Sequence, residues 1–162
     1  MIRTVLFATD LGAYSPVLLE HVALIAGQHS AEIVVFHAVE PFTHIADALV
    51  QTYLPLEAKR ELEEEGIDRI LQGIKQGIID ALEEDLFEGS EGLAYVREVR
   101  VERGPPAKLI LQTAQEFGAD LIILGSHGVN SSNPNMLGSV ASKILQLSTI
   151  PVYMVPLMRS AI

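Results

Sequence analysis

Apolar residues occur along this chain in two patterns: short continuous runs, and longer stretches in which they recur every three or four positions. Continuous runs rich in β-branched residues lie at residues 2–9, 31–39, 119–124 and 150–155. Such runs are typical of strands that are buried on both faces, as in a parallel sheet. Residues 93–101 instead alternate apolar and polar positions, which indicates a strand near the edge of the sheet.

Helical spacing of apolar residues fills the intervals between these runs. The pattern predicts helices over residues 15–27, about 57–82, 106–118 and 137–147. Ser15 can cap the first helix, Pro16 suits its first turn, and Gly27 is expected to stop it. The sequence therefore predicts strands that alternate with helices from one end of the chain to the other.

This alternation predicts one domain over residues 1–162, with a parallel sheet covered by helices on both faces. The length of 162 residues fits a single core. Residues 41–56 form a variable insertion after the second strand, where Ile45 and Leu49 suggest one short helical turn. Residues 157–162 form a C-terminal tail.

Composition narrows the functions that this fold could carry. The chain has 11 Lys and Arg residues against 21 Asp and Glu, a formal net charge of −10, which argues against nucleic-acid partners and anionic membranes. A phosphate site must therefore act locally, through backbone N–H groups or a metal ion. The absence of cysteine excludes thiolate catalysis. We find no signal peptide and no apolar run of about 18–20 residues, and expect a cytoplasmic protein.

The segment most informative about chemistry is LIILGSHGVNSSNPNMLGS, residues 121–139. A buried strand ends at Gly125, Gly128 follows, and Gly138 and Ser139 stand where a helix is expected to begin. Glycines allow a ligand to approach the backbone, and the first turn of a helix presents unpaired N–H groups. We therefore expect main-chain amides of residues 125–139 to converge on a phosphate. The alternative is that the glycines only form a turn and bind no ligand. Neither a Walker loop nor a GxGxxG motif is present.

The spacing of Gly125, Gly128, Gly138 and Ser139 matches the signature G-x2-G-x9-G-[S/T] of the universal stress protein family. The likeness covers nearly the whole chain, through the segments IRTVLFATDLGAYS, EIVVFHAVEP, ADLIILGSHG and LGSVASKILQLSTIPVYMVP. The chain therefore resembles this family. The resemblance implies an α/β fold, a three-layer open sandwich of the adenine nucleotide alpha hydrolase-like kind, with a five-stranded parallel sheet in the order 3-2-1-4-5.

The resemblance also implies a stress-response regulator that binds ATP, or the related AMP or ADP. The implied site residues are Ala8, Thr9, Asp10, Ala38, Leu124, Gly125, Ser126, His127, Gly128, Gly138, Ser139 and Val140. Base and ribose would lie near the tip of the first strand, the backbone of Ala38 would face the adenine edge, and Asp10 would help to hold Mg²⁺ or Mn²⁺ through the phosphates. The last strand, Pro151–Pro156, would pair two copies into a homodimer.

One departure from the family pattern bears on the ligand. Residues 129–137 contain no Lys or Arg, which many ATP-binding relatives carry in this loop. Helix-end contacts contribute only about 0.3–1 kcal/mol each when exposed. Weak binding, or a preference for AMP or ADP, is therefore one expectation. Two other functions stay open: a dimeric interaction module that binds no nucleotide, and a slow ATPase.

Several side chains near the expected site have a second interpretation. Asp10 could hold ribose or metal, or it could cap the turn that follows it. His37 and His127 are expected to line the cleft rather than to bind zinc, because no third ligand is spaced to join them. Ser126 is not expected to be a nucleophile, because adjacent Ser126 and His127 would point away from each other on an extended chain.

Overall fold

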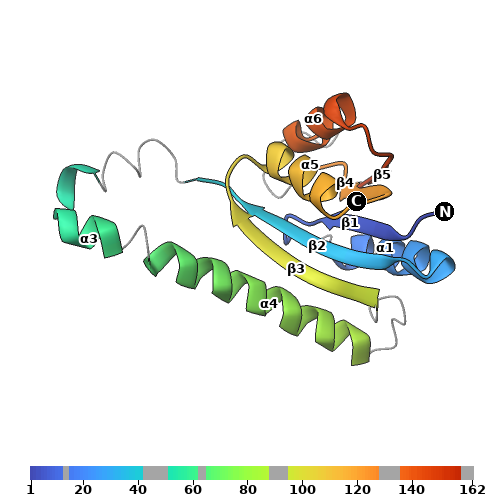
Figure 1. Cartoon of the computed structure of the whole chain (residues 1–162), viewed down its shortest axis with the longest axis horizontal. Coiled ribbons are helices and arrows are strands. Elements are labelled where there is room, and N and C mark those ends of the chain that lie inside the picture. The colour runs from blue at the N-terminus through green and yellow to red at the C-terminus, as the bar shows by residue number, and fades with distance from the viewer. Residues whose placement is uncertain (13–14, 42–50, 62–64, 88–94, 128–135, 158–162) are drawn as a thin grey trace, which may run out of the picture.

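The computed structural model describes residues 1–12, 15–41, 51–61, 65–87, 95–127 and 136–157 (Figure 1). In chain order its elements are β1 (Thr4–Ala8), α1 (Ser15–His29), β2 (Glu32–Val39), α3 (Leu56–Glu61), α4 (Ile67–Phe87), β3 (Val96–Arg103), α5 (Pro106–Glu116), β4 (Leu121–Gly125), α6 (Ser139–Leu147) and β5 (Val152–Val155). None of the helices in these ranges is long and apolar enough to cross a membrane.

The five strands form one parallel sheet in the order β3-β2-β1-β4-β5, which confirms the predicted α/β fold and strand order. The two edges of the sheet are β3, as the alternating pattern predicts, and β5. The chain reverses its direction of winding at β1, which has β2 on one side and β4 on the other. In an open parallel sheet, this switch point opens a crevice at the carboxyl ends of the strands.

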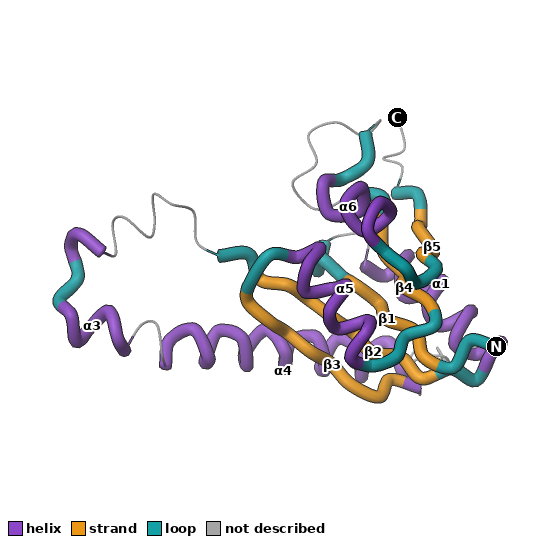
Figure 2. The backbone as a smooth tube through the Cα atoms, turned by 45° about the horizontal axis from the view of Figure 1, so that its top comes forward, coloured by secondary structure: helices purple, strands orange, loops and turns teal. Residues whose placement is uncertain are grey.

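Two hydrophobic clusters cover the two faces of the sheet and make the three layers visible in Figures 1 and 2. On one face, Phe7 and Ile123 pack with buried residues of α1 and α4. On the other, Leu6 and Ile122 pack with α5 and α6. Neighbouring strand residues point to opposite faces, so the continuous apolar runs supply both clusters at once. Full burial of one such side chain stabilises the fold by about 1.5–3 kcal/mol.

Helix α1 does not stop at Gly27, as the sequence predicts, but continues to His29. A side chain at position 27 would meet no other atom within 4 Å, so this glycine only weakens the helix slightly. The helix ends instead through Ser30, which has φ 51°. Ala31 N donates to Ala26 O over 2.9 Å, a bond that the left-handed residue makes geometrically accessible.

Two other helix boundaries differ from the sequence prediction. The long helix predicted from about residue 57 corresponds to two helices, α3 and α4, with residues 62–64 between them outside the described ranges. Helix α6 begins at Ser139 rather than at residue 137, because Gly138 has extended backbone angles of φ −59° and ψ 151°. The helical turn predicted around Ile45 and Leu49 also lies outside the described residues.

Candidate functional site

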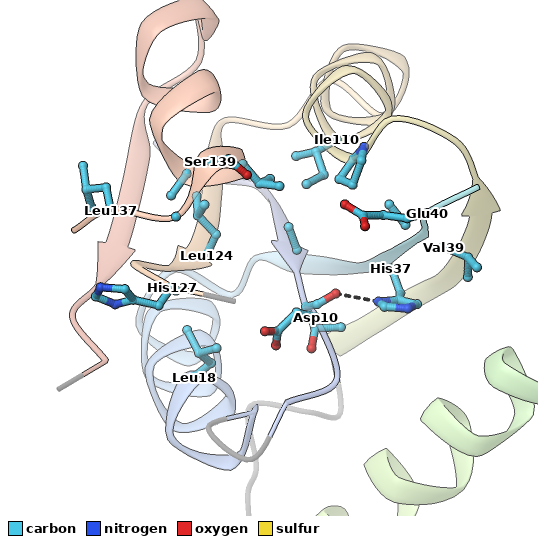
Figure 3. A pocket seen from close by; sticks show the side chains of 18 of the residues that line it. Asp10, Leu18, His37, Val39, Glu40, Ile110, Leu124, His127, Leu137 and Ser139 are labelled. Atoms are coloured by element: carbon cyan, nitrogen blue, oxygen red, sulfur yellow. Dashed lines mark hydrogen bonds between the residues drawn. The ribbon is translucent and has the colours of Figure 1, made fainter. Parts of the chain in front are cut away.

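A cavity of about 630 Å³ opens at the switch point of the sheet (Figure 3). Its floor comes from the tips of β1, β2 and β4, and one wall comes from the start of α6. The residues that line it are Ala8, Thr9, Asp10, Leu18, His37, Ala38, Val39, Glu40, Ile74, Pro106, Ile110, Leu124, Gly125, His127, Met136, Leu137, Gly138, Ser139, Val140 and Ala141. Ten of the twelve site residues predicted from the sequence therefore line one cavity.

The turn after β1 is held by side chains that bond to the backbone. Thr9 Oγ1 accepts a 3.0 Å hydrogen bond from Leu11 N, and Asp10 Oδ1 accepts a 2.9 Å bond from Gly12 N. These bonds hold Leu11 in the left-handed region, at φ 59°. The capping interpretation of Asp10 is thus confirmed. Asp10 also lines the cavity, so the capping bond and a ligand contact are compatible in the same side chain.

The tip of β2 leaves the backbone of Ala38 facing the cavity. In the parallel ladder, Phe36 O accepts from Thr9 N and Val39 O accepts from Gly104 N, so the backbone groups of β2 alternate between β1 and β3. Ala38 therefore directs its N–H and C=O toward β1, which ends at Ala8. The carbonyl oxygen of Thr9, the acceptor that a longer β1 would offer, instead accepts a 2.8 Å hydrogen bond from His37 Nδ1.

At the opposite wall, the first turn of α6 presents three backbone amides. Ser142 N donates to Gly138 O over 2.9 Å, and this is the first hydrogen bond of the helix. Within the described ranges, the N–H groups of Ser139, Val140 and Ala141 have no protein acceptor, as is usual for a first helical turn. All three residues line the cavity, where the positive end of the helix dipole favours an anion.

Not every amide of the glycine-rich segment is available, in contrast to the expectation for residues 125–139. Ser126 N donates to Val155 O, and Gly138 N donates to Ser126 O, each over 2.9 Å. These bonds anchor Ser126 to β5 and Gly138 to Ser126, so neither amide is available to a ligand. Gly128 and residues 129–135 lie outside the described residues.

Ser126 and His127 do contact each other, and the expectation that they point apart is wrong. Ser126 Oγ lies 2.7 Å from His127 Nδ1, because the chain leaves the extended conformation after Gly125. The Ser126 hydroxyl also accepts a 2.9 Å bond from Leu157 N. Ser126 is only 5% exposed and does not line the cavity, so its hydroxyl has a structural role and is not placed to attack a ligand.

Gly125 has a packing reason to be glycine. A Cβ atom at this position would come within 2.5 Å of Leu157 Cδ1 and 3.3 Å of Leu157 Cγ. Leu157 is buried in the same hydrophobic cluster as Phe7 and Ile123. The close approach that the sequence pattern suggests at Gly125 is therefore made by Leu157, which does not line the cavity.

The two histidines line the cavity, as expected, but from different sides (Figure 3). His37 comes from β2 beside Asp10, whereas His127 lies next to Leu137 on the α6 side. His127 Nε2 is buried and has no hydrogen-bond partner among the described residues. The described residues contain no group of three or more His, Asp or Glu side chains able to hold a metal ion.

Several lining residues carry no chemical signal in the sequence. Ile74, Pro106 and Ile110 look like ordinary helix residues, and only the packing of α4 and α5 against the sheet brings them to the cavity. Glu40, directly after β2, adds a second carboxylate. The position of each helix over the sheet determines these contacts, and hydrophobic periodicity gives only the face of a helix that is buried.

Known proteins share the sequence pattern and the fold of this chain. The universal stress protein family is matched over residues 1–156. This chain belongs to the universal stress protein family. Universal stress protein YxiE from Bacillus subtilis is 31% identical over 156 residues, which cover 96% of this chain and 99% of that protein. Universal stress protein MJ0577 from Methanocaldococcus jannaschii is 23% identical over 155 residues, 96% of this chain and 95% of that protein.

Solved structures of other universal stress proteins share the fold. The structure of MJ0577 has a TM-score of 0.71 at 23% identity and covers 99% of both chains. A universal stress protein solved in complex with cAMP has a TM-score of 0.54 at 19% identity, covering 95% of this chain and 96% of that one. The three-layer arrangement with strand order 3-2-1-4-5 is thus the architecture of this universal stress protein.

Proposed function

We propose that this universal stress protein binds an adenine nucleotide in the switch-point cavity and acts as a nucleotide-responsive regulator of the stress response. The observation that carries the proposal is a single cavity with unpaired backbone groups at two opposite walls. Ala38 offers a donor and an acceptor at one wall, and the first turn of α6 offers three donors at the other. The volume of about 630 Å³ lies within the usual range for small-molecule sites.

The Ala38 wall suits a purine base. One N–H donor and one C=O acceptor on the same residue match the ring nitrogen and the amino group at the edge of adenine. Val39 and Ile110 give the surrounding wall an apolar character that suits the faces of the base. That a structurally similar family member was solved with cAMP supports an adenine compound as the ligand class.

The α6 wall suits the phosphates. Ser139 adds a hydroxyl to the three free amides, and a helix N-terminus attracts negative charge even in a protein with a net charge of −10. Asp10 and Glu40 would repel a bare phosphate, so a divalent cation such as Mg²⁺ or Mn²⁺ would enter with the nucleotide. Asp10 would contact it through Oδ2, since Oδ1 accepts from Gly12 N.

The proposal includes a homodimer. Strand β5 forms one edge of the sheet, and no described strand pairs with its outer side. Tyr153 on β5 and Leu145 and Leu147 on α6 are exposed apolar residues. Antiparallel pairing with β5 of a second copy around a two-fold axis would satisfy the free backbone groups of the edge. We place this dimer in the cytoplasm.

Two variants of one residue test the nucleotide site. Ser139→Ala removes only the hydroxyl, whereas Ser139→Pro also removes the backbone N–H. Proline suits the first helical position, and Gly138 already has the extended conformation that a residue before proline prefers. Calorimetric titration with AMP and ATP, with and without Mg²⁺, should show binding to the unmodified protein and a larger loss of affinity for Ser139→Pro than for Ser139→Ala.

The same titrations separate the proposal from its alternative. If neither AMP nor ATP binds at millimolar concentration, while sedimentation shows a stable dimer, the protein is an interaction module and the nucleotide proposal fails. If nucleotide binds but Ser139→Pro and Ser139→Ala behave alike, the first turn of α6 is not the phosphate site. Thermal unfolding of each variant without ligand confirms that the helix still forms.

A further inference from the structure

A second groove adjoins the nucleotide cavity. It has a volume of about 510 Å³ and lies between α5 and α6, which run side by side over one face of the sheet in Figures 1 and 2. Four residues line both hollows: Glu40, Pro106, Ser139 and Val140. Ser139 and Val140, in the first turn of α6, therefore stand at the boundary between the two hollows.

Two lysines line this groove, one on each helix. Lys143 follows Ser139 by four positions on α6, so both residues lie on the same side of that helix. Lys108 stands in the first turn of α5, and Gln112 lies one turn further along the same side. The lining of the groove thus combines the first turn of α6 with two cationic side chains and the side-chain amides of Gln112 and Gln115.

Both lysines are free to bind an external anion. Neither forms an ion pair with any carboxylate in the described ranges, whereas Arg69, Arg97 and Arg100 do. In a chain with 11 basic residues and a net charge of −10, two unpaired lysines in one groove form a local exception to the acidic surface. Glu40, at the boundary, is the carboxylate among the residues that line the groove.

We infer that this groove receives the second and third phosphates of a nucleoside polyphosphate, with Lys108 and Lys143 as the cationic ligands. The inference rests on the proposed nucleotide site. In place of the expected preference for AMP or ADP, it predicts an affinity that rises with the number of phosphates. The lysines supply from α5 and α6 the positive charge that residues 129–137 lack. A longer polyphosphate fits the groove better than a monophosphate, which reaches only the α6 amides.

Titration with a phosphate series tests the inference. AMP, ADP and ATP are titrated in EDTA, so that no divalent cation neutralises the phosphates, and again with Mg²⁺. The titrations use the unmodified protein, Lys108→Gln, Lys143→Gln and the double variant. Each single change should weaken ATP binding by about fivefold and AMP binding by less than about twofold. ATP affinity should also fall more steeply with added salt than AMP affinity.

Lys75→Gln on α4 is the matched control, because it removes the same charge at a position that lines neither hollow. It should leave the ATP to AMP affinity ratio unchanged. The inference is overturned if the double variant keeps the unmodified ratio, or if AMP and ATP lose affinity equally. Retained AMP binding in that case leaves the proposed nucleotide site intact, whereas absence of all nucleotide binding to the unmodified protein, both in EDTA and with Mg²⁺, would end both proposals.

Discussion

His37 Nδ1 donates a 2.8 Å hydrogen bond to the carbonyl oxygen of Thr9, joining the tips of β2 and β1. A carbonyl oxygen only accepts, so Nδ1 of His37 carries the proton in this bond. The bond also occupies the acceptor to which Ala38 N would otherwise donate. His37 therefore keeps the backbone of Ala38 available for a ligand.

Replacing His37 by Phe should lower adenine affinity without unfolding the protein. An aromatic ring is kept, but Thr9 O becomes free to accept a hydrogen bond from Ala38 N. That bond would make Ala38 N unavailable to adenine. We expect AMP affinity to fall by about fivefold, the value of one ordinary hydrogen bond. The preference for AMP over GMP should fall with it, because the same backbone groups make the distinction. An unchanged preference in calorimetric titration would show that Ala38 does not read the base.

Gly125 and Leu157 should be coupled in stability. Gly125→Ala places a Cβ within 2.5 Å of Leu157 Cδ1 and forces a buried side chain to move. Overpacking of this kind costs about 1–3 kcal/mol. In a Leu157→Ala background the same change should cost less than about 1 kcal/mol, because the obstructing atoms are gone. Urea denaturation of the four proteins gives the coupling free energy, and an equal cost in both backgrounds would contradict this packing.

Asp120 should make stability depend on acid pH. The backbone N–H groups of Arg3 and Thr4 donate to Asp120 Oδ2 over 2.7 and 3.1 Å and hold the pKa of this carboxyl below its usual value. A lowered pKa stabilises the fold above the unfolded-state pKa, near 3.9, and the contribution is lost as pH falls through the folded-state pKa. Asp120→Asn should therefore lower the melting temperature at pH 7, and the difference should shrink below about pH 4.

Glu20→Gln serves as the control for this pH dependence, because Glu20 is an exposed carboxylate on α1. Its melting temperature should follow that of the unmodified protein at every pH. A gap between Asp120→Asn and the unmodified protein that stays constant from pH 7 to pH 3 would show that the lost charge is not responsible.

Ser30 and Gly118 end two helices in the same way, with φ angles of 51° and 60°. In each case the following residue donates to a carbonyl five positions back, Ala31 N to Ala26 O and Ala119 N to Ala114 O. The left-handed conformation costs a residue with Cβ about 1–2 kcal/mol. Ser30→Gly should therefore stabilise the protein by about 1 kcal/mol, and Gly118→Ala should destabilise it by a similar amount. Chemical denaturation at pH 7 measures both, and the same sign for the two changes would refute the argument.

Much of the sheet could be predicted because its signal is local. Leu6 and Phe7 lie in one apolar run, and a strand buried on both faces needs only such a run. The stop of α1 could not be predicted from Gly27, because glycine acts as a terminator only where the backbone becomes left-handed. In this chain Ser30 takes that conformation, and nothing in the sequence marks a serine for it.

Site residues at the ends of strands could be predicted from the sequence. Site residues that are brought together by contacts between segments distant in the sequence could not. Asp10 and Ala38 end their strands, so their place at the cavity follows from the sheet order alone. The contact of Ser126 with His127 and Leu157 requires the chain to turn after β4 and the C-terminal segment to return beside it. The lysine pair was missed for the same reason, because only the packing of α5 against α6 brings Lys108 and Lys143 to one groove.

Leu157 also sets how far the protein can be shortened. The family likeness ends at residue 156, yet Leu157 lies in the core cluster, covers Gly125 and donates its N–H to Ser126 Oγ. A version trimmed at the family boundary would keep every strand and every residue that lines the cavity. It would nevertheless lack Leu157, which packs against Gly125 and donates a hydrogen bond to Ser126 Oγ at the end of β4. The smallest unit expected to fold as the full chain does therefore extends at least through Leu157.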